Sequence, residues 1–190
     1  HNAPLADPKD LAALLASYAR EARHRIMAAG DVAIAPLNAL KASLEKALGL
    51  TFEGDKGEQF FRSTLVQTLF YGTFAAWVLQ HESDAPPEKF DWKTAAYNLH
   101  VPMVSALFEQ LTLPSKLKPL NLAEVLDWAT DALNRVDKAA FFSKFEADRA
   151  VQYFYEPFLE AFDPDLRREL GVWYTPEEIV RYQVARVDQV

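Results

Sequence analysis

The chain of 190 residues contains no cysteine and only six glycines. The absence of cysteine excludes disulfide bonds, thiolate metal ligands and a cysteine nucleophile. The shortage of glycine, together with abundant Ala, Leu, Glu and Lys, favours helices over a turn-rich sheet architecture. The sequence also lacks a signal peptide and any apolar run of the roughly 20 residues needed to span a bilayer. We therefore expect a cytoplasmic protein that makes no membrane contact.

Basic residues are fewer than acidic ones, and the net charge is −7. A stand-alone nucleic-acid binder usually carries a basic excess, because neutralisation of phosphates supplies most of its affinity. Arg20, Arg23 and Arg25 form a local basic cluster, which we interpret as a solvated helix face. Half of the residues are hydrophobic and a quarter are charged, which is typical of a soluble globular protein. The length of 190 residues is enough for one domain or at most two small ones.

Capping and helix-breaking residues divide the chain into helices. Asp7 before a proline supplies an N-cap, and Gly30 and Gly49 follow apolar-periodic segments as C-terminal residues. Asn121–Glu124 has the pattern of a capping box, and Pro102 is expected to kink or split its helix. The expected helices cover about residues 8–30, 36–48, 58–81, 91–111, 121–133, 148–162, 163–170 and 175–190, with a polar connection over 51–57 and a loop over 113–120.

The segment 58–81 differs from the others because apolar residues cover nearly its whole circumference. A helix of this kind must be enclosed by other helices. Gly72 within it would let a neighbouring element approach closely, at a cost of about 1 kcal/mol relative to alanine. The sequence therefore predicts an all-α fold, a multi-helix orthogonal bundle around this central apolar helix. The apolar residues of the segment are Phe60, Phe61, Leu65, Val66, Leu69, Phe70, Phe74, Trp77 and Val78.

Few residue patterns indicate catalysis or metal binding. The sequence has no Gly-rich phosphate loop, no Gly-x-Ser-x-Gly elbow and no His-Glu-x-x-His pair. Glu21 and His24 have the Glu-x-x-His spacing of di-iron helix bundles, but such sites need a second copy and two further glutamates. We interpret Glu21 and His24 as surface residues, and His81 and His100 as packed or partly exposed histidines.

Two further groups of residues have both a functional and a structural interpretation. Asp127 and Asp131, four residues apart on a helix, are either a carboxylate pair or exposed acidic residues. A set of aromatic residues is either a stacking platform for bases or part of the core. We interpret the set as core, because few basic residues accompany it. The set comprises Phe141, Phe142, Phe145, Tyr153, Phe154, Tyr155, Phe158 and Phe162.

Two stretches of the chain resemble a known family. The first is 59–77, which reads QFFRSTLVQTLFYGTFAAW. The second comprises FYEPFL at 154–159, DPDLR at 163–167 and GVWYTP at 171–176. Together they resemble the helical region that precedes the methylase core in single-chain restriction-modification enzymes of the adenine-N6 class. The resemblance covers most of the chain from about residue 56 onward.

The resemblance implies a cofactor contact near the end of the chain. In that family the Gly-x-x-Tyr-Thr-Pro loop packs beside S-adenosylmethionine, and the helix after it starts the methylase domain. Tyr174, Thr175 and Pro176 would therefore touch the methionine end of S-adenosylmethionine in the full-length parent protein. This role is physically reasonable, since a helix N-terminus presents free N–H groups and partial positive charge to the carboxylate of the methionine end.

The chain lacks the motifs that carry out methyl transfer in that family. It has no Asn-Pro-Pro or Asp-Pro-Pro before an aromatic residue, the element that holds the flipped adenine. We therefore expect no catalytic residue, no metal and no bound cofactor in this fragment alone. Residues 1–55 have only the pattern of amphipathic helices, and we expect an N-terminal helical pair there. The resemblance implies a helical coupler core over 56–170 and a junction over 171–190 that ends in the first helix of a truncated methyltransferase domain.

The expected function is that of a non-catalytic helical coupler in an adenine-N6 DNA methyltransferase or restriction enzyme that uses S-adenosylmethionine. Its partners would be the methylase, recognition and any nuclease domains of the same polypeptide, with DNA bound through the parent protein. The chain begins at His1 without an initiator methionine and stops at Val190 inside an apolar-periodic segment, and we interpret both ends as cuts. The alternative is a stand-alone helical protein–protein interaction or scaffold module, which the composition fits equally well.

Overall fold

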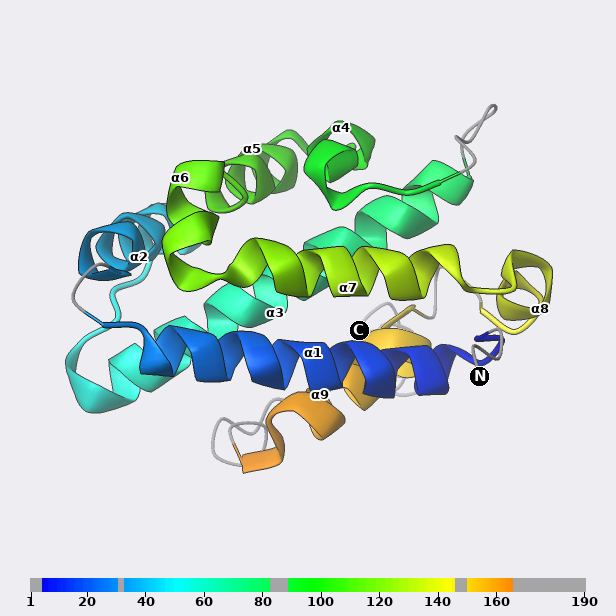
Figure 1. Ribbon diagram of the computed structural model, residues 1–190, viewed down its shortest axis with the longest axis horizontal. Coiled ribbons are helices and arrows are strands. Elements are labelled where there is room, and N and C mark those ends of the chain that lie inside the picture. Colours follow the sequence, from blue (N-terminus) through cyan, green and yellow to red (C-terminus); the bar gives the residue numbers. More distant parts are fainter. Residues whose placement is uncertain (1–4, 31–32, 83–88, 146–149, 166–190) are drawn as a thin grey trace, which may run out of the picture.

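The computed structural model describes residues 5–30, 33–82, 89–145 and 150–165 (Figure 1). Helices account for nearly all of the regular structure in these ranges, and extended segments pair there at one isolated bridge, between Leu5 and Val136. The predicted all-α class is therefore confirmed. None of the helices in these ranges is both long enough and apolar enough to cross a membrane.

The helices follow one another through short connections. A 3₁₀ turn (Trp92–Thr94) precedes α4, another (Lys118–Leu120) follows α6, and a π-helical turn (Val151–Tyr155) leads into α9. The α-helices of the described ranges are α1 (Pro8–Ala28), α2 (Ile34–Leu48), α3 (Gly54–His81), α4 (Ala95–Asn98), α5 (Pro102–Leu111), α6 (Pro114–Leu117), α7 (Leu122–Asn134), α8 (Lys138–Phe142) and α9 (Glu156–Phe162).

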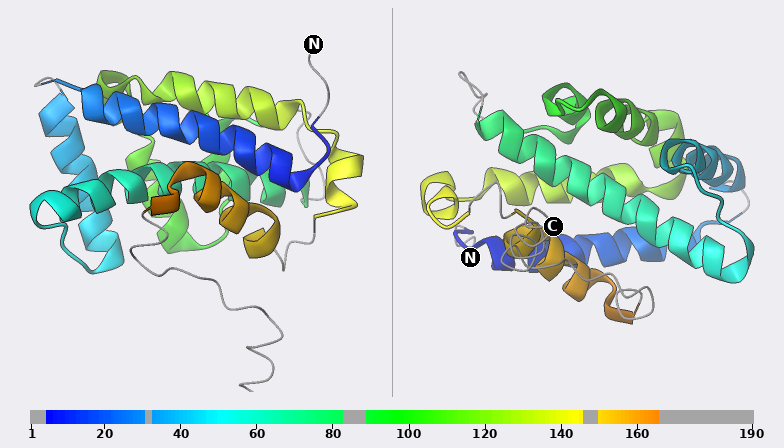
Figure 2. Two further views of the ribbon diagram at one scale, coloured as in Figure 1. Left: turned by 90° about the horizontal axis from the view of Figure 1, so that it is seen from below. Right: turned by 180° about the vertical axis from the view of Figure 1, so that it is seen from behind.

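Helix α3 occupies the centre of the bundle. It runs obliquely behind α1 and α7 in Figure 1 and packs against α1, α2, α4, α5 and α7. Helices α1 and α7 lie side by side and run in opposite directions, and α9 packs along α1 (Figures 1 and 2). The apolar circumference of α3 thus has neighbours on several sides, as its sequence pattern requires.

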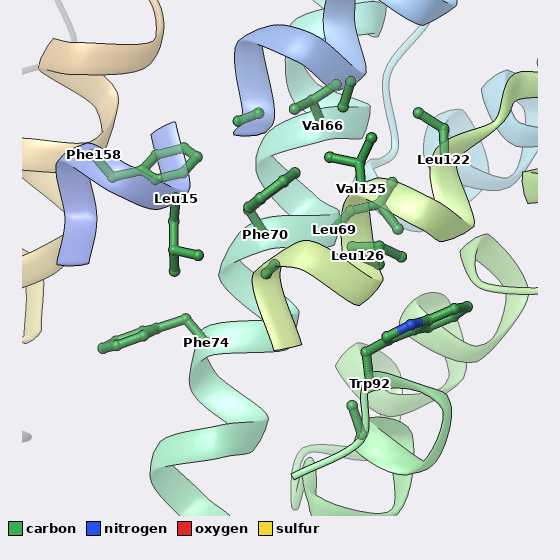
Figure 3. Packing of buried hydrophobic residues seen from close by; sticks show 14 of the residues in the cluster. Leu15, Val66, Leu69, Phe70, Phe74, Trp92, Leu122, Val125, Leu126 and Phe158 are labelled. Atoms are coloured by element: carbon green, nitrogen blue, oxygen red, sulfur yellow. The ribbon is translucent and has the colours of Figure 1, made fainter. Parts of the chain in front are cut away.

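The core lies where α1, α3, α7 and α9 meet (Figure 3). Leu15 of α1, Phe70 and Phe74 of α3 and Phe158 of α9 are each at most 1% exposed. Full burial of such a side chain contributes about 1.5–3 kcal/mol to stability. One hydrophobic cluster includes residues from α1 through α9. The apolar residues predicted for the central helix are all buried except Phe60, which is partly buried.

The predicted capping and helix-breaking residues are confirmed at several helix ends. The Asp7 side chain accepts a hydrogen bond from the Lys9 N–H and caps α1. Gly49 ends α2 with a φ of 67°, the left-handed conformation that glycine adopts without strain. Pro102 splits the predicted helix 91–111 and becomes the first residue of α5. Gly30 differs: α1 ends at Ala28, its C-cap Ala29 is extended, and Gly30 has no positive φ.

Other boundaries differ from the sequence prediction. Helix α3 begins at Gly54 rather than residue 58, so the polar connection is shorter than expected. The proposed loop 113–120 contains α6, whose first residue is a proline. The capping box at Asn121 does not form, because Asn121 has a φ of 53° and its side chain makes no cap hydrogen bond. Helix α8 was not predicted at all, although Asp137 caps it by accepting from the Ala140 N–H.

The C-terminal part of the prediction is tested only as far as Asp165. The expected helix over 148–162 is present as the π-helical turn followed by α9. The expected helices over 163–170 and 175–190 lie largely or wholly outside the described residues.

A candidate docking groove along α3

The residues predicted to contact the cofactor, Tyr174, Thr175 and Pro176, lie outside the described residues. In the described ranges, no group of three or more His, Asp or Glu side chains is placed to hold a metal ion. Glu21 accepts a hydrogen bond from Arg25 at 2.8 Å, and His24 is exposed. The Glu-x-x-His pair thus consists of surface residues, as we interpreted it.

The three arginines of α1 donate to other helices. The prediction of a solvated face is wrong for Arg23 and Arg25, which are partly buried, whereas Arg20 is exposed. Arg20 donates to the carbonyl of Ala161 in α9, and Arg23 donates to the carboxylate of Asp163 at 2.5 Å. These bonds fix the C-terminal end of α9 against α1. The sequence concealed this role, because a basic helix face looks the same whether its partners are water or a helix far along the chain.

Arg25 ties α1 to α7. It donates to Glu124 at 2.7 Å and to the backbone carbonyl of Asn121 at 2.7 Å, in addition to Glu21. The hydrogen bond to Glu21 has the largest effect on the pKa of the Arg25 guanidinium and raises it. Burial lowers this pKa, and the hydrogen bond to Glu124 raises it further. The guanidinium also lies 4.9 Å from the ring centroid of Trp128. Glu124, the acidic residue of the predicted capping box, thus forms an ion pair that joins α7 to α1.

The histidines and the aspartate pair do not converge on a site. His81 stacks on Phe142 with ring centroids 3.9 Å apart, and His100 is exposed. Asp127 and Asp131 are both exposed, and Asp127 also accepts a hydrogen bond from the indole N–H of Trp92 at 2.7 Å. Asp127 therefore secures the segment before α4 to α7, and the two carboxylates do not act together.

The aromatic set near residues 141–162 belongs to the core, as interpreted. Phe141, Phe154, Phe158 and Phe162 are at most 1% exposed and cannot offer their faces to bases. Phe74 of α3 stacks on Phe154 with ring centroids 3.5 Å apart and an interplanar angle of 6°. Tyr71 meets Tyr155 edge to face at 4.7 Å. The rings join the two stretches that carry the family resemblance.

Three adjoining cavities form a groove, of which one face of α3 lines two and helices α2 and α5 line the third. Their volumes are about 420, 300 and 190 Å³. The first two share Ala47, Met103 and Leu107, and the second and third share Ala75 and Tyr155. The α3 residues along the groove recur at helical spacing and so form one stripe. They are Thr68, Tyr71, Gly72, Phe74, Ala75, Val78, Leu79 and Glu82.

Helices α2 and α5 form the wall at one end of this groove. Met103 and Val104 of α5 are 65% and 39% exposed, and Leu48 of α2 is 47% exposed. The hydrophobic periodicity of residues 36–48 predicts that Leu48 is buried, which is wrong. Hydrophobic periodicity identifies an apolar face, but it does not reveal whether another element covers that face.

Charged residues stand at opposite ends of the groove. Lys46 lines the cavity between α2 and α5, where Lys116 of α6 also donates to Ser43 at 3.4 Å. Burial lowers the pKa of Lys116. Glu82, at the end of α3, lines the cavity at the other end. The groove is therefore apolar along its floor, with positive charge at one end and negative charge at the other.

The shape and chemistry of the groove suit an elongated apolar partner. The polar residues that line it are spread over α2, α3 and α5, whereas small-molecule pockets place a few polar groups around one point. A helix with one apolar face recognises such a groove through side chains at i, i+3, i+4 and i+7.

Comparison of the chain with protein-family models, curated proteins and solved structures gives no match.

Proposed function

We propose that this chain is a non-catalytic helical coupler in an adenine-N6 DNA methyltransferase of a restriction-modification enzyme that uses S-adenosylmethionine. Its role is to hold the methylase core in a fixed position relative to the recognition domain and any nuclease domain of the same cytoplasmic polypeptide. DNA contact and methyl transfer belong to the parent protein. Tyr174, Thr175 and Pro176 form the cofactor-facing part of the junction in that parent.

The packing between the two resembling stretches supports this proposal most strongly. Phe74 stacks on Phe154, and Phe70 lies 6.0 Å from Phe158 between ring centroids. Aromatic pairs of this kind add about 0.5–1.5 kcal/mol each beyond the area that they bury. Segments that are some eighty residues apart in the sequence thus form one rigid contact. A coupler needs such rigidity, because a packed core transmits position where a flexible linker does not.

The anchoring of α9 gives further support. Asp163 accepts hydrogen bonds from Arg23 of α1 and from the Ser63 hydroxyl of α3, at 2.5 and 3.1 Å. Asp163 precedes Gly171 by only eight residues. The chain is therefore held at a defined point shortly before the junction, which is where a coupler has to fix its neighbour.

Methyl transfer tests the proposal. The parent protein that continues past Val190 is incubated with labelled S-adenosylmethionine and unmethylated DNA, beside residues 1–190 alone. We expect label on adenine N6 with the longer protein and none with residues 1–190. A longer protein that transfers no methyl group to adenine contradicts the proposal.

The open groove favours a second candidate, a stand-alone interaction or scaffold module. An exposed apolar surface often marks a protein-binding site. The two candidates differ in the reading frame past Val190. The coupler requires a glycine-rich cofactor motif there, followed by Asn-Pro-Pro or Asp-Pro-Pro and an aromatic residue, whereas an interaction module requires neither.

A further inference from the structure

The cavity between α2 and α5 carries positive charge that no acidic residue neutralises. None of the residues that line this cavity or the next one is acidic. Lys46 lines it, and Lys116 of α6 reaches it by donating to the Ser43 hydroxyl at 3.4 Å. In the part of the chain that the structure describes, neither ammonium group forms an ion pair. The charge at this end is therefore free to meet an external anion.

Ser43 brings the two ammonium groups to the same place. Ser43 and Lys46 are three residues apart on α2 and so lie on one helix face. The Ser43 hydroxyl donates to the carbonyl of Ala39 at 2.8 Å, which leaves its oxygen to accept from Lys116. An ammonium has three N–H donors, so Lys116 keeps others for a ligand. Burial lowers the pKa of Lys116, and a bound anion would favour its charged form.

An apolar channel leads away from this charged end. Ala47, Met103 and Leu107 line both the cavity of about 420 Å³ and the adjoining one of about 300 Å³, which reaches Gly72 and Phe108. Sites for small molecules have volumes of about 300–1,000 Å³. Met103 is 65% exposed, so a ligand that covers it removes apolar surface from water. Cationic donors at one end and an apolar floor beyond them match an amphiphilic anion.

We propose that this site, formed by α2, α5, α6 and the middle of α3, binds a free medium-chain fatty acid. Its carboxylate accepts hydrogen bonds from Lys46 and Lys116. Its unbranched chain lies over Ala47, Met103 and Leu107, toward Gly72 of α3. The cavity that Glu82 lines, at the far end of the groove, stays outside this site.

Other occupants match the charges less well. An apolar helix or a second copy of the chain would cover the channel floor, but neither supplies a carboxylate for Lys46 and Lys116. An anionic membrane attracts basic segments, whereas this chain has a net charge of −7. A free fatty acid satisfies both the floor and the two ammonium groups.

This inference goes beyond the proposed function and needs neither S-adenosylmethionine nor DNA. It is tested on residues 1–190 alone. Its failure would therefore leave the methyl-transfer test untouched, and a parent protein that transfers no methyl group would leave the fatty-acid site untouched.

Calorimetric titration with a matched series of ligands tests the chemistry of the site. Octanoate, decanoate and dodecanoate vary the chain, whereas decanol and decylamine change the head group of decanoate. We expect each methylene to tighten binding by up to about fourfold, the equivalent of about 0.8 kcal/mol. Decanol should bind at least about tenfold more weakly than decanoate, because it has no charge to meet the ammonium groups. Equal binding of decanoate, decanol and decylamine, or no binding of decanoate, overturns the proposal.

Lysine variants test the head-group contact. Lys116→Gln should weaken decanoate binding by about tenfold, because a partly buried charged hydrogen bond is lost. Lys46→Gln, at an exposed position, should weaken it by about two- to fourfold. Lys118→Gln is the control, because Lys118 is exposed and does not line the cavity. Equal affinities of the three variants contradict a carboxylate held at Lys46 and Lys116.

A filled cavity tests the place of the chain. Ala106→Trp puts a bulky ring into the cavity between α2 and α5 and leaves both lysines in place. It should weaken decanoate binding by at least about tenfold through steric clash. The control Ala13→Trp, at an exposed position of α1, should bind decanoate like the unaltered chain. Circular dichroism checks that each variant keeps its helices. Undiminished binding by Ala106→Trp overturns the proposal.

Sedimentation of the unaltered chain tests the other occupants. We expect a monomer that phosphatidylglycerol vesicles do not retain. A dimer that Ala106→Trp dissociates would show that a second copy fills the cavity, and retention by the vesicles would show a membrane-binding surface. Either result overturns the fatty-acid proposal.

Discussion

The ring of Phe108 in α5 occupies the space where a side chain at Gly72 of α3 would begin. A Cβ atom at position 72 would lie 2.7 Å from Cε2 of Phe108 and closer still to Cδ2. The sequence prediction that Gly72 permits a close approach is thus confirmed, and its partner is identified. Gly72 and Phe108 both line the middle cavity of the groove.

Gly72→Ala should therefore destabilise the protein, although alanine favours a helix by about 1 kcal/mol over glycine. Overpacking costs about 1–3 kcal/mol and outweighs that gain, so we expect a net loss of about 1–2 kcal/mol. Urea unfolding measures this loss in the free energy of unfolding. Gly30→Ala is the control, because nothing lies within 4 Å of its Cβ position. If Gly72→Ala is as stable as the control or more so, the close contact is not real.

The Arg23–Asp163 pair should contribute measurably to stability. The two side chains are 31% and 13% exposed and joined at 2.5 Å. A double-mutant cycle with Arg23→Ala and Asp163→Ala should give a coupling energy of about 1–2 kcal/mol, because partial burial limits solvent screening. The exposed pair Lys144–Asp7, at 3.6 Å, should couple by less than about 0.5 kcal/mol. Equal coupling in both pairs would remove the argument that Arg23 anchors α9.

The stack between Phe74 and Phe154 should dominate the contact between the two resembling stretches. Phe74→Leu removes the stacking partner but keeps an apolar side chain. We expect a loss of about 1–3 kcal/mol from lost packing and aromatic contact. Phe60→Leu, at a partly buried position of the same helix, should cost less than half as much. Thermal and urea unfolding of the two variants provide the comparison.

Asp127 should act through Trp92 and not together with Asp131. Asp127→Ala leaves the indole N–H of Trp92 without its acceptor at 2.7 Å and should cost about 1–2 kcal/mol. Asp131→Ala, at a position that is also exposed but makes no hydrogen bond among the described residues, should change the free energy of unfolding by less than about 0.5 kcal/mol. Equal effects of the two substitutions would point instead to a shared carboxylate site.

Local signals in the sequence predicted much of the fold, and contacts between distant residues account for what they missed. Asp7, Gly49 and Pro102 marked helix ends because each acts on the backbone nearest to it. Leu48 and Val104 are exposed because no described helix covers them, and a local sequence pattern carries no information about tertiary neighbours. The partners of Arg23 and Arg25 lie on α9 and α7, so their role emerged only with the packing.

The candidate site was predictable in part. The apolar stripe of α3 was visible as a run of hydrophobic residues, but its open side was not. An exposed groove requires both an apolar helix face and the absence of a neighbour in the described structure. The predicted cofactor contact at Tyr174 stays a prediction, because that residue lies outside the described ranges.

Binding of S-adenosylmethionine tests the central claim most directly. The affinity is measured by calorimetry for the longer parent protein, for its Tyr174→Ala variant and for a Tyr97→Ala control, in which an 87% exposed tyrosine of α4 is removed. We predict that the parent binds the cofactor, that Tyr174→Ala weakens binding by about tenfold, equivalent to 1.4 kcal/mol, and that Tyr97→Ala leaves it unchanged. A parent that binds no S-adenosylmethionine, or equal affinities for all three proteins, would contradict the coupler account.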